Sequence, residues 1–446
     1  RSHTAALTGV DARYDAIFAQ YGVIRVQDYD ELLEVAHLLA HTPRPAVPGI
    51  AVVSHSGGIS SLTADMCGQA GLDLPTLGEA ARDGINGILK GFGWAANPAD
   101  VTGFANSESF PQIMQDMIND PRMGTLVVAS AGADIQAQQV ISQRDRTDKG
   151  MVFLWTGSRD AKAGLAMLRD ARIPVFYTPD TLARGLRSRL AYHTWRERRL
   201  ADGFATAPSR TAAQQAAIAR ALGLGRPTLS ESESKQLLAA WGVGSAREVL
   251  VASAEAAVEA AEQLGFPVAL KVDSPDILHK TEAGVVRLNL RDAAQVRTTY
   301  AEVMASAGAH APQARITGVS VQEMVGDGVE VIVGVSCDPQ LGPVLLFGSG
   351  GVMVEVYNDV ALRRCPITRR EAQAMIAEVK GARLLQGFRG RAAADLEALA
   401  DTLVRVSHLA THMEAHLAEL DINPLMVLPA GRGVKAVDAL VVLRGA

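Results

Sequence analysis

The amino-acid sequence predicts an α/β protein in which a doubly wound parallel-sheet domain precedes an α+β domain. Over residues 21–200, short apolar runs rich in β-branched residues alternate with amphipathic stretches. Parallel strands that are buried on both faces give continuous apolar runs, so this alternation indicates a parallel sheet with helices on both sides. Beyond residue 220, strand-like runs cluster and a long helical stretch follows, which is typical of an α+β domain.

The first domain is expected at residues 21–195, after a lead-in over residues 1–20. Its expected strands are VIRV (23–26), IAVVS (50–54), TLVVAS (125–130), MVFLWTG (151–157) and PVFYTP (174–179). Amphipathic patterns at 29–40 and 61–71 predict helices between them. Residues 196–220, charged at first and then small and polar, form the expected linker.

The second domain is expected at residues 221–446, as two subdomains. It opens on a helix over 230–242 with a capping box, in which Ser230 is the N-cap and Glu233 follows three residues later. Further strands and helices are expected, in order, at 247–253, 254–264 (helix), 266–274, 284–290, 318–325, 329–336, 342–348, 369–418 (helical), 417–428 and 434–443.

The composition narrows the class of protein. The 446 residues carry a net charge of −5, so no basic surface indicates nucleic-acid binding. The three cysteines are scattered without metal-site or disulfide-framework spacing, which fits a reducing cytoplasm. No apolar run approaches the roughly 20 residues of a membrane span. We therefore expect a cytoplasmic protein with neither a nucleic-acid nor a membrane partner.

Three segments of the second domain carry candidate ligand-binding residues. Lys271 ends an apolar strand, where a plain surface lysine is equally possible, and a loop with His279 and Lys280 follows. Two Gly-rich turns come later, and such turns let backbone N–H groups approach phosphates. The first turn places Gln322, Glu323, Val325 and Glu330, and the second places Gly348, Gly350 and Gly351.

The last two expected strands hold acids in apolar surroundings. Asp421 and Asn423 are two residues apart, so both side chains point to one face of a strand. Asp438 is a lone acid in the next strand, where burial without a partner is costly. Two acids and an amide on neighbouring strands suit Mg²⁺ with nucleotide phosphates. The alternative is a satisfied turn of Asp421 and Asn423 before Pro424.

Together these residues carry a family resemblance. The order of Lys271, HKTEAG, VQEMVGDGVE, GSGG and DINPL…D resembles an ATP-grasp domain, and more narrowly that of the ADP-forming acyl-CoA synthetases, relatives of succinyl-CoA synthetase. Residues 49–103, with SHSGGIS, resemble the flavodoxin-like domain of that family, and the opening SHTAALTG resembles its phosphohistidine loop. The resemblance covers essentially the whole chain.

The resemblance implies a role for each matched residue. Lys271 would contact the nucleotide phosphates and Lys280 the nucleotide. Gln322, Glu323 and the backbone near Val325 would hold the adenine, and Glu330 the ribose. Gly348, Gly350 and Gly351 would cover the phosphates, Arg363 would steady the transferring phosphoryl group, and Asp421, Asn423 and Asp438 would face Mg²⁺. His3 would carry the phosphoryl group, and Ser56, Gly57 and Gly58 at a helix N-terminus would stabilise it there. His279 could be a second phosphate relay, a nucleotide contact or a solvated loop residue.

The implied activity joins a carboxylic acid to CoA with ATP, giving acyl-CoA, ADP and phosphate through an acyl phosphate. The family's N-terminal CoA-binding domains are not in the sequence, so the opening residues are expected to be the edge of a cut in a longer, fused and homodimeric protein. SHSGGIS stands where relatives usually carry an Asn-Ala-Gly-Gly pattern, which bears on the acid pocket. Two alternatives are a regulatory synthetase-like region of a protein acetyltransferase and another ATP-grasp carboxylate ligase.

Overall fold

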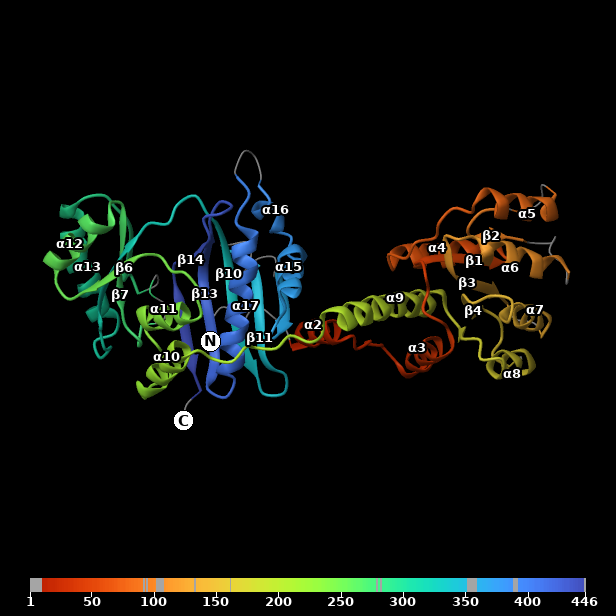
Figure 1. The fold of residues 1–446 in the computed structure, drawn as a ribbon, viewed down its shortest axis with the longest axis horizontal. Helices are drawn as coiled ribbons and strands as arrows, with labels where there is room; N and C mark the ends of the chain where they lie inside the picture. The colour runs from red at the N-terminus through yellow and green to blue at the C-terminus, as the bar shows by residue number, and fades with distance from the viewer. Residues whose placement is uncertain are drawn as a thin grey trace. The chain divides into compact units, whose positions relative to one another are not determined.

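The structure is a computed structural model that describes residues 10–90, 93, 95–101, 108–131, 134–160, 162–277, 280, 283–350, 359–387 and 392–444. The chain divides into two compact units. The parallel-sheet unit is Tyr21–Gly203, and the two-sheet unit joins the residues up to Gln20 with those from Phe204 onward. Figure 1 shows the first in orange to yellow and most of the second in green to blue.

The parallel-sheet unit has one five-stranded sheet with every described pairing parallel. The strand order is β2-β1-β3-β4-β5, which is the order of flavodoxin-like doubly wound sheets. The strands are β1 (Gly49–Ser54), β2 (Ala99–Asp100), β3 (Met123–Ser130), β4 (Gly150–Trp155) and β5 (Val175–Phe176). The predicted fold class of this part is confirmed.

Helices cover both faces of this sheet. Alternate residues of β1 enter different cores: Ala51 and Val53 pack with one set of helices, and Ile50 and Val52 with the other. This is the two-residue period expected of a strand buried on both sides. The first set is α5 (Glu79–Leu89), α6 (Ser109–Asn119), α7 (Asp134–Arg144) and α8 (Lys162–Asp170); the second is α3 (Tyr29–His41), α4 (Gly57–Gln69) and α9 (Pro179–Asp202).

One expected strand of this unit is wrong. VIRV at 23–26 forms no strand, and Val23 is half exposed. A short β-branched run forms a strand only where a neighbour supplies hydrogen-bond partners, and these residues connect α2 (Val10–Tyr21) to α3 instead. The structure adds β2, whose two residues are too few to give a pattern in the sequence.

The two-sheet unit contains two antiparallel sheets with separate cores. The smaller sheet has the order β6-β9-β7-β8 and packs against α12 (Ala254–Leu264) and α13 (Ala293–His310). Its strands are β6 (Glu248–Val251), β7 (Val268–Asp273), β8 (Val286–Leu290) and β9 (Gly318–Glu323).

The larger sheet runs β12-β11-β10-β13-β14, with β15 also paired to β13. The strands are β10 (Val329–Asp338), β11 (Gly342–Ser349), β12 (Val360–Arg364), β13 (Leu417–Val427), β14 (Val434–Ala436) and β15 (Ala439–Leu443). The helices that share its core are α10 (Ala212–Gly223), α11 (Glu231–Ala240), α15 (Arg369–Glu378), α16 (Ala382–Leu385) and α17 (Leu396–His412). The capping box of Ser230 and Glu233 at the start of α11 is confirmed.

The structure differs from the sequence predictions in two segments of this unit. The helical stretch over 369–418 is three helices, because the chain turns near Gly381 and again at Gly387, which has a φ of 93° that favours glycine. Asp395 then caps α17 by accepting a hydrogen bond from the Ala398 N–H. The strand expected over 434–443 is divided into β14 and β15, with Val437 and Asp438 at the break.

Candidate functional site

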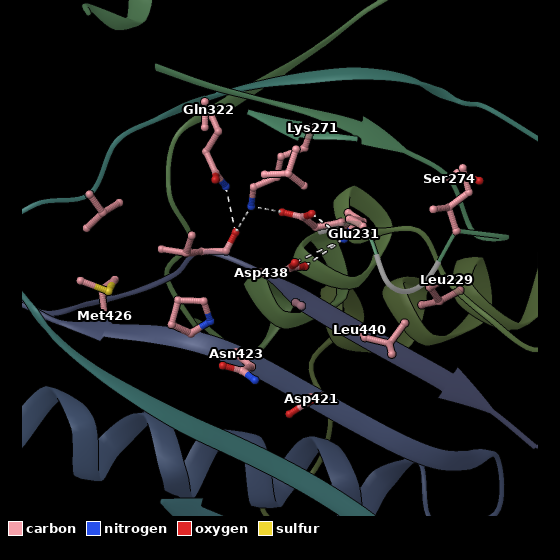
Figure 2. A pocket seen from close by; sticks show the side chains of 18 of the residues that line it. Leu229, Glu231, Lys271, Ser274, Gln322, Asp421, Asn423, Met426, Asp438 and Leu440 are labelled. Carbon is pink, nitrogen blue, oxygen red and sulfur yellow. Dashed lines mark hydrogen bonds and ion pairs between the residues drawn. The ribbon is translucent and has the colours of Figure 1, made fainter. Parts of the chain in front are cut away.

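A cavity of about 840 Å³ lies in the two-sheet unit, lined by residues of both sheets and of α11. A volume of this order suits a nucleotide-sized ligand. Most of the predicted nucleotide and metal residues line it: Lys271, Lys280, Gln322, Glu323, Val325, Glu330, Asp421, Asn423 and Asp438. Figure 2 shows several of these side chains, which come from strands that are far apart in the sequence.

The backbone segments that carry the three predicted metal ligands are adjacent where β13 faces the break between β14 and β15. Asp421 pairs with Leu440 of β15, and the Asn423 N–H donates to the Asp438 carbonyl at 3.2 Å. Both residues project from one strand beside the cavity, as expected (Figure 2). Two carboxylates and an amide oxygen at one place are ligands that a hard cation such as Mg²⁺ accepts, so the residues present fit that ion.

Lysine side chains gather around one glutamate at the back of this cavity. Lys271 Nζ lies 2.9 Å from Glu231 Oε1 and donates to the Val437 carbonyl at 2.9 Å. Lys280 Nζ lies 2.8 Å from Glu231 Oε2 and 3.1 Å from Asp438 Oδ1. Glu231 was not predicted as a site residue, because in the sequence it is only an acid in the first turn of a capped helix.

These contacts set the charge states of the cluster. Burial acts to raise the pKa of Glu231, but attraction to the surrounding lysines outweighs it and holds that pKa well below its usual range. Burial acts to lower the pKa of Lys280, but Asp438 and Glu231 raise it above its usual value. Burial and repulsion from Glu231 raise the pKa of Asp438. Asp438 lines the cavity, and about a third of its side chain is exposed.

Two predicted base contacts have side chains that are already engaged. The Gln322 amide donates to the Val437 carbonyl at 3.0 Å and to Glu248 at 3.3 Å. Glu323 accepts from Arg247 Nε at 2.7 Å and from Lys435. A base held in this part of the cavity would therefore rely on backbone groups near Val325 more than on these two side chains.

The predicted phosphate-covering glycines lie at the end of β11. Gly348 is paired with Ile332 of β10, and the Gly350 N–H donates to the Glu330 carbonyl at 3.0 Å. A Cβ at Gly350 would come within 2.6 Å of the Glu330 backbone, so the close approach requires glycine. Gly351 lies outside the described residues.

The structure tests the position of only one of the three predicted catalytic residues, Arg363. His3 and His279 lie outside the described residues. Arg363 is on β12, where it forms an ion pair with Glu378 at 2.7 Å and is not among the residues that line the cavity. The structure therefore pairs Arg363 with a carboxylate at the end of α15.

The parallel-sheet unit has a smaller hollow of about 240 Å³ at the carboxyl ends of β1 and β3. In this strand order that is the topological switch point, where ligands of doubly wound sheets bind. Ser56 caps α4 there, and its Oγ accepts from the Ile59 N–H at 3.5 Å. A Cβ at Gly57 would lie 2.7 Å from an Asp100 carboxylate oxygen, so an anion at this helix start would approach that carboxylate. A Cβ at Gly58 would lie 3.9 Å from Ser56 Oγ, an ordinary contact distance.

Other candidate sites gain no support from the part of the chain that is described. Within it, no group of three or more His, Cys, Asp or Glu side chains is arranged to hold a metal ion. His408 and His412 of α17, with His416 four residues further on, therefore do not form such a group. No helix among the described residues is long and apolar enough to cross a membrane.

Comparisons with known proteins agree with this geometry. Residues 220–443 match the family of the ATP-grasp domain, and residues 1–39 match the succinyl-CoA ligase-like flavodoxin domain. The 4-hydroxybutyrate–CoA ligase [ADP-forming] of Nitrosopumilus maritimus is 30% identical over 98% of this chain and 63% of its own length. The subunit beta of acetate–CoA ligase [ADP-forming] II from Pyrococcus furiosus is 40% identical over 51% of this chain and 97% of its own length.

A solved structure resembles about half of the chain. The PH1788 protein of Pyrococcus horikoshii Ot3 has a TM-score of 0.50 and 38% identity, and the match covers 52% of this chain and 98% of that one. The chain spans somewhat under two thirds of the length of the full-length relatives that it matches along its whole extent.

Proposed function

The chain belongs to the family of ADP-forming acyl-CoA ligases, and we propose that it forms the nucleotide-binding and phosphoryl-transfer part of such a ligase. The complete reaction would convert a carboxylic acid, CoA and ATP into acyl-CoA, ADP and phosphate. The observation that carries the proposal is the cavity of the two-sheet unit, which is lined by Lys271 and Lys280 as well as by Asp421, Asn423 and Asp438.

ATP would bind in this cavity with its phosphates toward the lysines. Lys271 and Lys280 would supply positive charge to the phosphates, and the backbone at Gly348 and Gly350 would cover them. Asp421, Asn423 and Asp438 would hold Mg²⁺, which neutralises phosphate charge when it is bound. Glu330, at the start of β10, remains the proposed ribose contact because it lines the same cavity.

His3 would accept the phosphoryl group and carry it to the acid. An imidazole nitrogen attacks the γ-phosphorus, the bond to the bridging oxygen breaks, and ADP leaves. The carboxylate then takes the phosphoryl group from the histidine, giving an acyl phosphate and free imidazole. CoA thiolate displaces phosphate from that acyl phosphate and forms the thioester. The match of residues 1–39 to a succinyl-CoA ligase-like domain supports His3 in this role.

The remaining site residues enter the same scheme as proposals. Ser56, Gly57 and Gly58 would stabilise the phosphohistidine through the free N–H groups and the positive end of α4. His279 would be a phosphate relay near the nucleotide, and Arg363 would have to exchange Glu378 for the phosphoryl group. The full-length protein would bind CoA and the acid, work in the cytoplasm and form a homodimer. The relatives act on different acids by name, so no particular acid is proposed.

A labelling experiment tests the phosphohistidine. We expect incubation of the full-length protein with γ-labelled ATP and Mg²⁺ to give an acid-labile, base-stable phosphoprotein, because a phosphorus–nitrogen bond hydrolyses in acid. The label should be absent from His3→Ala and kept by His412→Ala, which changes a histidine of α17 that bonds only the Pro208 carbonyl in the described part of the chain. An unlabelled parent protein would overturn the phosphohistidine mechanism.

A further inference from the structure

Glu231 is the one carboxylate in the described residues that contacts both predicted nucleotide-binding lysines. Its Oε1 is 2.9 Å from Lys271 Nζ and its Oε2 is 2.8 Å from Lys280 Nζ. A third cation, Lys235, lies 2.7 Å from Oε1, one helical turn along α11. Only 4% of Glu231 is exposed, so these charges meet away from bulk water. Figure 2 shows Glu231 between Lys271 and Asp438.

The contacts of Glu231 exclude two simpler roles. Both of its oxygens accept from ammonium groups and only 3% of its side chain is exposed, so Glu231 has no side open to a metal ion, whereas 35% of the Asp438 side chain is exposed. An ordinary helix-capping acid is also excluded, because the capping box uses the Glu233 carboxylate instead. What remains is a buried anion that two lysines from outside its helix share.

Lys271 keeps bonding capacity for a ligand while it stays on Glu231. An ammonium group has three N–H donors. Lys271 spends one on Glu231 and one on the Val437 carbonyl. Lys280 spends its donors on Glu231 and on the Asp438 carboxylate. A phosphate oxygen in the cavity can therefore take the third N–H of Lys271 without breaking its contact with Glu231.

Glu231 is itself fixed from behind. Lys235 bridges it to Glu248 with a second contact of 2.7 Å, and only 3% of the Lys235 side chain is exposed. Glu248 in turn accepts from Ser320 Oγ at 3.1 Å on β9. The glutamate is thus held by the smaller sheet as well as by α11, and it brings two like charges to one place that would otherwise repel each other.

We propose that Glu231 is a positioning residue that holds Lys271 and Lys280 ready for the nucleotide phosphates. The proposal rests on the proposed function, because it takes the cavity to be the ATP site. Its consequence is specific to the phosphates: loss of the Glu231 charge should weaken binding in proportion to the phosphates that the ligand carries. The part of the cavity that would hold the base, near Val325, should be unaffected.

The test measures binding to the whole chain by titration calorimetry. The probes are a non-hydrolysable ATP analogue with Mg²⁺, and adenosine, which has no phosphate. We expect Glu231→Gln to weaken the analogue by about tenfold or more, because charged hydrogen bonds are lost, while adenosine binding stays unchanged. The matched control is Glu233→Gln, the same substitution two residues along α11, since glutamine also completes a capping box.

Each outcome decides the point. Equal weakening of adenosine would give Glu231 a merely structural role, and unchanged or tighter analogue binding would show that it does not position the lysines; either result overturns the inference. If Glu231→Gln does not fold, Glu231→Asp, which keeps the charge but withdraws it by one methylene, should still weaken the analogue alone. A parent chain that binds neither probe overturns the proposed function and this inference with it.

Discussion

The carboxylate of Glu323, which lines the cavity, forms ion pairs with two basic side chains. It accepts from Arg247 and from Lys435, and only 12% of its side chain is exposed. Burial acts to raise its pKa, but these contacts lower the pKa of Glu323 to about 2. A carboxyl with a lowered pKa in the folded chain stabilises the fold above the unfolded value of about 4.3 and loses that effect as pH falls through the folded value.

We therefore expect Glu323→Gln to lower the urea concentration of half-unfolding at neutral pH. The deficit relative to the parent should shrink as pH falls from about 4.3 toward about 2, because protonation then removes the same charge from the parent. Urea unfolding across that range measures it. Glu378→Gln is the control, since this exposed partner of Arg363 should change stability little. A Glu323→Gln deficit that stays constant down to the lowest pH would contradict the assignment.

Single residues were predictable where a charge interrupts an apolar strand. Lys271, Asp421 and Asp438 met that condition, and all three line the cavity. Glu231 did not, because acids in the first turn of a helix usually face water near the positive end of its dipole. Its partner Lys271 is 40 residues away, and only the tertiary fold joins them. The spacing of Glu231 and Lys235 by one helical turn was the available signal, but surface pairs share it.

Close backbone contacts between strands, as well as charge interactions, hold the residues of the site in position. The Gly350 N–H bonds the Glu330 carbonyl, so the end of β11 rests directly on the start of β10. We expect Gly350→Ala to force these segments apart, because its Cβ would lie 2.6 Å from the Glu330 backbone. The loss of stability should be about 1–3 kcal/mol by urea unfolding, with weaker binding of the ATP analogue.

Gly326→Ala is the matched control for this change. Gly326 lies in the turn between β9 and β10, and a Cβ there would meet nothing within 4 Å. The control should be neutral or slightly stabilising, because alanine restricts the unfolded chain more than glycine does. If the two variants lose equal stability, the contact between Gly350 and Glu330 is not what requires glycine.

For helices and strands, sequence patterns predicted the long buried strands well but did not predict where a strand is broken or absent. β1, β3 and β4 were expected because each is a continuous apolar run. VIRV is also rich in β-branched residues, but it forms no strand because no strand lies beside it. A local sequence pattern cannot reveal whether a neighbouring strand is present. The break at Val437 and Asp438 was also hidden, since apolar residues flank it on both sides. That break exposes a carbonyl to Lys271 and Gln322 and is part of the site.

The molecule as a whole contains two units with separate cores, and the cavity belongs to one of them. All of its lining residues fall between Thr228 and Val442. Pyrococcus furiosus has a relative of this half as a distinct subunit that matches over 97% of its length. The composition predicted a linker over residues 196–220, and the structure divides the chain between Gly203 and Phe204. The contacts of Gln20 were not predicted: it bonds both the N–H and the carbonyl of Arg364.

We expect residues 204–446, produced alone, to fold cooperatively and to bind the ATP analogue with Mg²⁺ within about threefold of the whole chain. The reason is that the separate piece keeps the cavity and both of the cores that support it. It should unfold at slightly lower urea, since it lacks the Gln20 bonds to β12, and Gln20→Ala in the whole chain should reproduce that loss. Calorimetry and urea unfolding measure both. Residues 21–203 are the negative control for binding. A piece that folds but binds far more weakly would show that the nucleotide site needs residues from elsewhere in the chain.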